Sequence, residues 1–132
     1  MAMDGSNLCK KKCVKLLEKL HLPHGLLPLL DLLEVGRNKV TGFVWLWQQS
    51  MAMIRDFKKI KKMVSYAMED MGSAEDCRMK RMIGVKSKEL LIWFLIFDML
   101  VANPEGEKIA FKTTSRLGRA FPFFAFEEEG EE

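Results

Sequence analysis

The most apolar run in the chain reads Leu90-Leu91-Ile92-Trp93-Phe94-Leu95-Ile96-Phe97, and Glu89 and Asp98 bound it. Eight residues are far too few for a membrane-spanning helix. Periodicity alone does not separate a buried strand from a buried helix in so short a run. The break at Ile83-Gly84 and the turn signal Asn103-Pro104-Glu105-Gly106 favour the strand. We therefore predict that the run is a buried central strand and that the fold is built around it.

Length and composition indicate one small domain. The 132 residues are 48% hydrophobic and 30% charged, which is an ordinary balance for a globular protein. The net charge of +3 is too small to indicate a nucleic acid partner. The three cysteines show no disulfide spacing, and the first residues contain no apolar core of a signal peptide. We expect a soluble, cytoplasmic protein.

The N-terminal segment from Leu8 to Leu20 predicts an amphipathic helix, which Pro23 and Gly25 end. Its apolar positions recur at helical spacing: Cys13, Leu16, Leu17 and Leu20. Lysines occupy the other faces: Lys10, Lys11, Lys12, Lys15 and Lys19. Lys11, Lys12, Lys15 and Lys19 are candidate contacts with an anionic membrane or a partner. The alternative is a helix docked on its own sheet with the same lysines facing water.

Two further stretches of the sequence predict strands, and a third stretch is ambiguous between strand and helix. In Thr41–Trp47 the side chains of Phe43, Trp45 and Trp47 would share one face. Lys108–Thr113 also alternates between polar and apolar residues. Met53–Met71 has apolar residues three and four apart, which by itself is a helical pattern. We divide the chain into residues 1–20 (polar N-terminus and helix), 21–127 (one β-rich domain) and 128–132 (acidic tail).

Blocks of this sequence resemble, in order, a plant family catalogued as domain of unknown function 538. The blocks are Leu22–Pro28, Thr41–Leu46, Phe57–Ile60 with Val64–Ala67, Gly84–Trp93, and Ile109–Thr113 followed by Phe121-Pro122. The resemblance runs from about His21 to Glu127. It implies a mainly β fold, with a strongly curved, barrel-like antiparallel sheet after a short helix. That shape has been likened to tubular lipid-binding proteins.

The resemblance also bears on the ambiguous stretch and on function. It favours strands across Phe57–Met71, because tertiary context often overrides local propensity. The sequence departs from the family after Tyr66, where Met-Glu-Asp-Met-Gly replaces the usual valines and threonines. Roles in plant stress and development are attributed to the family, and hydrolase or pigment-binding activities have been suggested. The family supplies no agreed catalytic residues.

The sequence offers only weak candidates for catalysis. A serine nucleophile needs an adjacent base and donors for the oxyanion, and no serine lies in a Gly-x-Ser-x-Gly elbow. Ser65 or Ser87 assisted by His24 is conceivable if the fold brings them together. Exposed or capping hydroxyls are the alternative reading.

Metal and nucleic acid sites are not expected. Four zinc-ligand types lie close together in the sequence: Cys9, Cys13, His21 and His24. The gap between Cys13 and His21 is shorter than a finger loop, and cysteines four apart on a helix are usually packing residues. The clustered lysines fit solvated faces better than a phosphate-binding surface. We expect no metal, no cofactor and no nucleic acid partner.

Ten methionines would make the interior soft enough to line a cavity for an apolar ligand. The candidate lining residues are Phe43, Trp45, Trp47, Met63 and Met68. We therefore predict a non-catalytic protein that binds a hydrophobic or amphiphilic, lipid-like small molecule. Two alternatives stay open, an esterase-like hydrolase and a membrane-surface or protein-interaction module.

Overall fold

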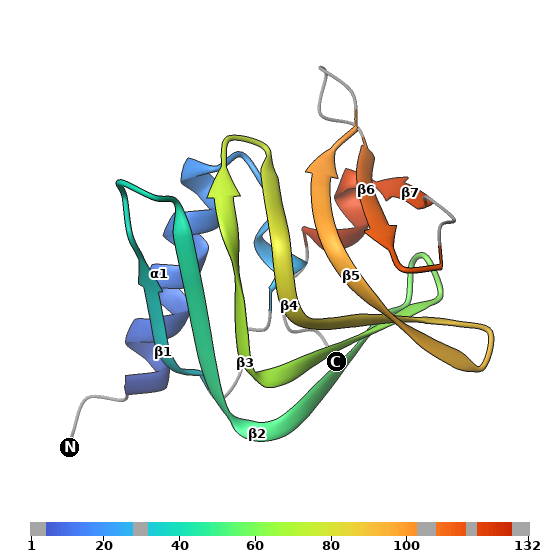
Figure 1. Ribbon diagram of the computed structural model, residues 1–132, viewed down its shortest axis with the longest axis horizontal. Coiled ribbons are helices and arrows are strands. Elements are labelled where there is room, and N and C mark those ends of the chain that lie inside the picture. The colour runs from blue at the N-terminus through green and yellow to red at the C-terminus, as the bar shows by residue number, and fades with distance from the viewer. Residues whose placement is uncertain (1–4, 28–31, 103–107, 116–118, 128–132) are drawn as a thin grey trace.

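The computed structural model describes residues 5–27, 32–102, 108–115 and 119–127 (Figure 1). Its helical elements are α1 (Gly5–Lys19), η1 (His24–Leu26) and η2 (Phe123–Phe126). Its strands are β1 (Leu32–Arg37), β2 (Phe43–Phe57), β3 (Lys62–Glu75), β4 (Arg78–Glu89), β5 (Ile92–Val101), β6 (Lys108–Thr113) and β7 (Arg119–Pro122). The predicted turn after Ala102 and the acidic tail 128–132 lie outside the described residues. The helix predicted at the N-terminus and the strand predicted at Lys108–Thr113 are confirmed.

The seven strands form one antiparallel sheet in sequence order, each strand paired with the next. β2, β3 and β4 bend sharply about half-way along their length (Figure 1). Each of their pairings has an irregular register near that bend, as expected where bulges increase curvature. Within the described residues β1 and β7 do not pair, so the sheet stays open. The mainly β, antiparallel prediction is confirmed, and closure into a barrel is not.

The ambiguous stretch Met53–Met71 consists of the end of β2, a turn at residues 58–61 and most of β3. Strands here are confirmed. Ile54 and Phe57 would share an apolar face in a helix, but as strand residues three apart they point to opposite faces. Accordingly the side chain of Ile54 is 55% exposed, whereas that of Phe57 is 4% exposed. Pairing with a neighbouring strand outweighs the local helical spacing.

The core fills one side of the sheet. α1 and η2 both lie behind the strands in the view of Figure 1, α1 behind β1 and β2 and η2 behind β5 and β6. α1 buries its apolar stripe completely at Cys13 and Leu17. At the other end the ring of Phe126 packs 4.9 Å from that of Phe57 and 5.5 Å from that of Phe111. One continuous apolar core therefore joins the helix to the C-terminal strands.

The run Leu90–Phe97 is not a buried strand along its whole length. β4 ends at Glu89, which pairs with Ile92 of β5, so Leu90 and Leu91 form the turn between them. Only Ile96 of the eight residues is classed as buried. A central strand is confirmed for Ile92–Phe97, which lie in β5 between β4 and β6. Burial of the whole run is wrong for two physical reasons: a hairpin turn falls inside the run, and the remaining strand residues alternate between the two faces.

Candidate functional site

The turn between β4 and β5 exposes large apolar side chains. Leu90, Leu91 and Ile92, here called the apolar turn, are 95%, 87% and 59% exposed. Leu90 has a φ of 58°, a left-handed conformation that glycine and asparagine adopt far more readily. Hairpin turns are ordinarily built from such small or polar residues. The fold therefore does not explain leucines at this position.

A second turn, between β2 and β3, lies beside the apolar turn. It reads Lys58-Lys59-Ile60-Lys61, here called the basic turn, and its three lysines are exposed. Val64 pairs with Ser87, so the register brings residues 58–61 and 90–91 to the same end of the sheet. Both turns lie at the right of Figure 1. The lysines of the basic turn and the exposed side chains of the apolar turn therefore lie at the same end of the sheet.

The strand residues on either side of the apolar turn also combine lysines with large apolar side chains. The ammonium of Lys88 lies 5.8 Å from the centre of the Trp93 ring, a cation–π contact on the paired strand. Lys86 is exposed opposite Leu95, whose side chain is 45% exposed. Tryptophan and lysine side chains together are typical of surfaces that meet a boundary between water and an apolar phase.

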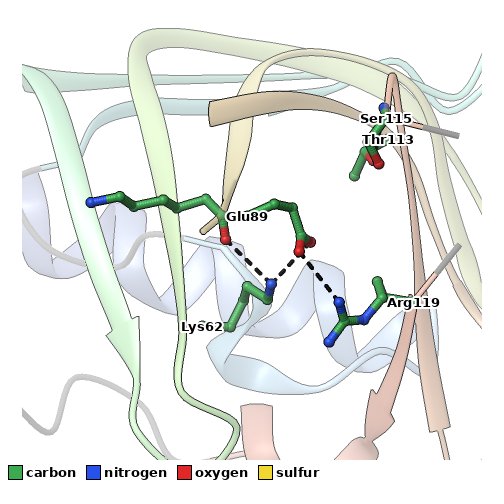
Figure 2. Close-up of polar contacts among 6 residues, drawn as sticks. Lys62, Glu89, Thr113, Ser115 and Arg119 are labelled. Carbon is green, nitrogen blue, oxygen red and sulfur yellow. Dashed lines mark hydrogen bonds and ion pairs between the residues drawn. The ribbon is translucent and has the colours of Figure 1, made fainter. Parts of the chain in front are cut away.

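An ion cluster adjoins the two turns, because Lys62 directly follows the basic turn and Glu89 directly precedes the apolar turn. Figure 2 shows its side chains. Lys62 Nζ is 2.9 Å from Glu89 Oε2 and donates to the carbonyl oxygen of Lys88 at 3.2 Å. Arg119 donates to Glu89 Oε1 at 3.3 Å. The side chains of Lys62 and Glu89 are only 8% and 16% exposed. The cluster ties β3, β4 and β7 together where the turns begin.

Two hydroxyls lie in the same region without joining that cluster. Thr113 and Ser115 share a hydrogen bond of 2.7 Å, and Thr113 is buried. In Figure 2 the pair lies well apart from Lys62 and Glu89. The hydrogen bond to Thr113 caps the end of β6, since the amide of Ser115 also donates to the threonine hydroxyl.

The predicted ligand-lining residues lie on the outer face of the sheet. Phe43 and Trp47 are 40% and 42% exposed, and Trp45 Nε1 donates to Glu34 Oε2 at 2.7 Å. Met63 and Met68 are 36% and 41% exposed. The shared face of the three aromatic residues is confirmed, but that face points away from the core.

A small space lies elsewhere, beside Asp70, Met79 and Met82. Its volume is about 20 Å³, enough for about one water molecule, whereas small-molecule sites measure about 300–1,000 Å³. It is therefore too small for a lipid. Burial raises the pKa of Asp70 to about 7, although the amide of Ala67 donates to Asp70 Oδ1 and opposes the shift.

Three of the four candidate lysines of α1 line an open groove against β1. Lys12, Lys15 and Lys19 share this groove of about 720 Å³ with Arg37 and Trp45. Lys11 is exposed on the same helix. Because the apolar stripe of α1 is buried in the core, the helix is docked on its own sheet with lysines toward water. That stripe is not available to a membrane.

The candidate catalytic residues are separated by the pairing of the strands. Ser87 is buried opposite Val64, whereas Ser65 is opposite Lys86 on the other face of the sheet. His24 Nε2 is 3.1 Å from Glu18 Oε2, beyond the end of α1. Ser65 and Ser87 therefore point to opposite faces of the sheet, and the described contact of His24 is with Glu18 and with neither serine.

Sequence reasoning missed the apolar turn because it treated eight apolar residues as one element. One signal was present. Uncharged Val85 and Ser87 alternate with Lys86 and Lys88, so one strand could have been placed before Leu90 in addition to the strand after it. The pairing of Lys62 with Glu89 had no signal in the sequence, because the two are 27 residues apart.

The comparisons with known proteins give one result. A family model described as protein of unknown function, DUF538, matches residues 13–127, which is most of the chain. The chain belongs to this family. No curated protein and no solved structure matches the DUF538 chain. Among the described residues, no helix is long and apolar enough to cross a membrane.

Proposed function

We propose that this DUF538 protein binds the surface of anionic membranes through the apolar turn and the basic turn. The observation that carries the proposal is the exposure of Leu90 and Leu91 at the tip of a hairpin. Exposed apolar groups rimmed by polar residues mark contact sites on soluble domains. The lipid-like ligand expected from the sequence is, in this proposal, the bilayer itself.

The free energies expected from burial of the apolar side chains and from the lysines support reversible binding to a membrane. Burying a leucine or isoleucine side chain contributes about 1.5–3 kcal/mol each. Each lysine near an anionic surface contributes about 1 kcal/mol. Lys58 and Lys61 are exposed beside the apolar turn, and Lys86 is exposed on its flank. Neither contribution alone gives firm binding, so we expect both to be needed.

Charge complementarity favours an anionic bilayer over a second copy of the chain. The neighbourhood of the apolar turn is basic, and its nearest carboxylate, Glu89, is already held by Lys62 and Arg119. Two copies meeting at this end would bring like charges together, which opposes association. Trp93 directly follows the apolar turn, so in this proposal its ring would lie between the apolar chains and the headgroups, where tryptophan is favoured.

The test compares sedimentation of the full chain with vesicles of phosphatidylcholine alone and with vesicles that also contain phosphatidylserine. We expect binding to the anionic vesicles, weaker at high salt. A variant with Leu90→Ser and Leu91→Ser should bind roughly 100-fold more weakly, since two leucines contribute about 3 kcal/mol or more.

Val40→Ser is the matched control, because Val40 is 94% exposed in the turn between β1 and β2. It should bind as the unaltered protein does. Equal binding by the double leucine variant would overturn the proposal. So would a concentration-dependent dimer that the leucine changes abolish while no vesicle is bound, because the apolar turn would then serve self-association.

A further inference from the structure

Three metal-ligand side chains meet at the end of α1. A ring nitrogen of His21, a carboxylate oxygen of Asp76 and Cys77 Sγ all lie within 4.8 Å of one another. They come from two segments, since His21 follows α1 and the other two residues form the turn between β3 and β4. His21 and Asp76 are more than two-thirds exposed, so an ion can reach the cluster from solvent, and it would replace the direct contact of 2.6 Å between His21 Nδ1 and Asp76 Oδ1.

The backbone holds these segments in contact. The amide of Cys77 donates to the carbonyl oxygen of Leu20 at 2.6 Å, and that of Val101 donates to the carbonyl oxygen of Cys77 at 2.9 Å. His21 and Cys77 both have left-handed backbones, with φ of 61° and 62°. The hydrogen bonds fix these conformations and direct the two side chains to the same place.

The charges around the cluster suit a cation. The neighbouring basic residues are engaged elsewhere, Arg78 with Asp98 at 2.6 Å and Lys80 with Glu75 at 2.9 Å. The Asp76 carboxylate and a Cys77 thiolate together would neutralise a divalent ion. Imidazole and thiolate are ligands that favour zinc over magnesium or calcium.

We propose that His21, Asp76 and Cys77 bind Zn²⁺. On binding, the Cys77 thiol releases its proton to solvent and the thiolate bonds to the metal. Three protein ligands leave the fourth tetrahedral position to water. The cysteines of α1 take no part, because Cys9 and Cys13 are buried in the core. The site crosslinks the end of α1 to the β3–β4 turn.

The test titrates the reduced, metal-free full chain with Co²⁺ and then with Zn²⁺. We expect a thiolate-to-cobalt charge-transfer band in the near ultraviolet that Zn²⁺ abolishes by displacement. Cys77→Ser should remove this band. His21→Gln should weaken Zn²⁺ affinity by roughly 100-fold or more, since even supporting partners of metal ligands are worth 10–100-fold.

Two controls separate a metal site from a simple contact between His21 and Asp76, whose nitrogen and oxygen are 2.6 Å apart. Asp76→Asn can keep the hydrogen bond but loses the charge, so it should weaken metal binding while far-ultraviolet circular dichroism stays unchanged. His24→Gln removes the other histidine and should bind Zn²⁺ normally. Absence of the cobalt band, or a band that survives Cys77→Ser, would overturn the proposal.

Discussion

Asp70 is a carboxyl group placed in the core of the sheet. It is 5% exposed, and its Oδ2 atom has no hydrogen-bond partner among the described residues. Gly84 makes room for it, because a Cβ at that position would collide with Asp70 Oδ1. Burial disfavours the ionised form and raises the pKa of Asp70 from 3.8 to about 7.

The raised pKa of Asp70 has a definite consequence for stability. Between about pH 4 and pH 7 the folded state keeps the proton that the unfolded state has lost. Stability from this group is therefore greatest at low pH and falls as pH rises through that window. A shift of this size corresponds to about 4 kcal/mol at most.

Asp70→Asn should abolish this dependence. We expect the variant and the unaltered protein to have similar free energies of unfolding near pH 4. At pH 8 the variant should be more stable by roughly 2–4 kcal/mol, because no buried charge forms. Urea unfolding at several pH values measures the difference. A difference that is independent of pH would contradict the assignment.

At the scale of elements, the ion cluster of Lys62, Glu89 and Arg119 links the ends of β3, β4 and β7. Lys62 begins β3, Glu89 ends β4 and Arg119 begins β7. A buried pair that loses one partner leaves a charge without compensation, whereas loss of an exposed partner has a small effect. The ion pair of Lys62 with Glu89 should therefore contribute much to the free energy of unfolding, and the contact of Arg119 with Glu89 should contribute little.

Glu89→Gln should lower the free energy of unfolding by about 3 kcal/mol, because the buried ammonium of Lys62 loses its counter-charge. Arg119→Ala should lower it by no more than about 1 kcal/mol, since the side chain of Arg119 is 48% exposed. Thermal and urea unfolding of both variants provide the measurement. A double variant, Lys62→Met with Glu89→Leu, should recover most of the loss. Equal effects of the two single changes would show that the buried pair is not dominant.

At the scale of the whole molecule, β4 separates the two proposed sites. Arg78, its first residue, follows Cys77, and Glu89, its last, precedes the apolar turn. Twelve strand residues span at most about 40 Å. Figure 1 shows the β3–β4 turn and the β4–β5 turn well apart despite the bend, so we expect that an anionic membrane bound at one end of β4 leaves the other end in water.

This arrangement predicts the orientation of the protein on a vesicle. An environment-sensitive fluorophore attached through Leu91→Cys, in a chain that also carries Cys77→Ser, should shift to the blue with anionic vesicles. The same fluorophore on Cys77 of the unaltered chain should not shift. Cys9 and Cys13 are buried and should not react in the folded state. A blue shift at both positions would contradict this orientation.

The sequence by itself determined the amphipathic helix, the strand at Lys108–Thr113 and the alternation of side chains in the strand after Gly42, but not which of that strand's two faces is inward. Each depends on a local period of side chains, which a chain shows before it folds. The family was also recognisable, because several short blocks follow one another in order. The Met53–Met71 stretch needed that resemblance, since its local period alone indicated a helix.

Only the tertiary structure decided where Leu90 and Leu91 lie and which distant groups meet. A run of apolar residues predicts that burial is favourable, but it does not predict where a hairpin turn falls within the run. That position depends on the pairing of Glu89 with Ile92 and on the ion pair with Lys62. The meeting of His21 with Cys77 likewise requires α1 to dock against the β3–β4 turn. The contacts of Lys62 with Glu89 and of His21 with Cys77 join residues far apart in sequence, so no local pattern could reveal them.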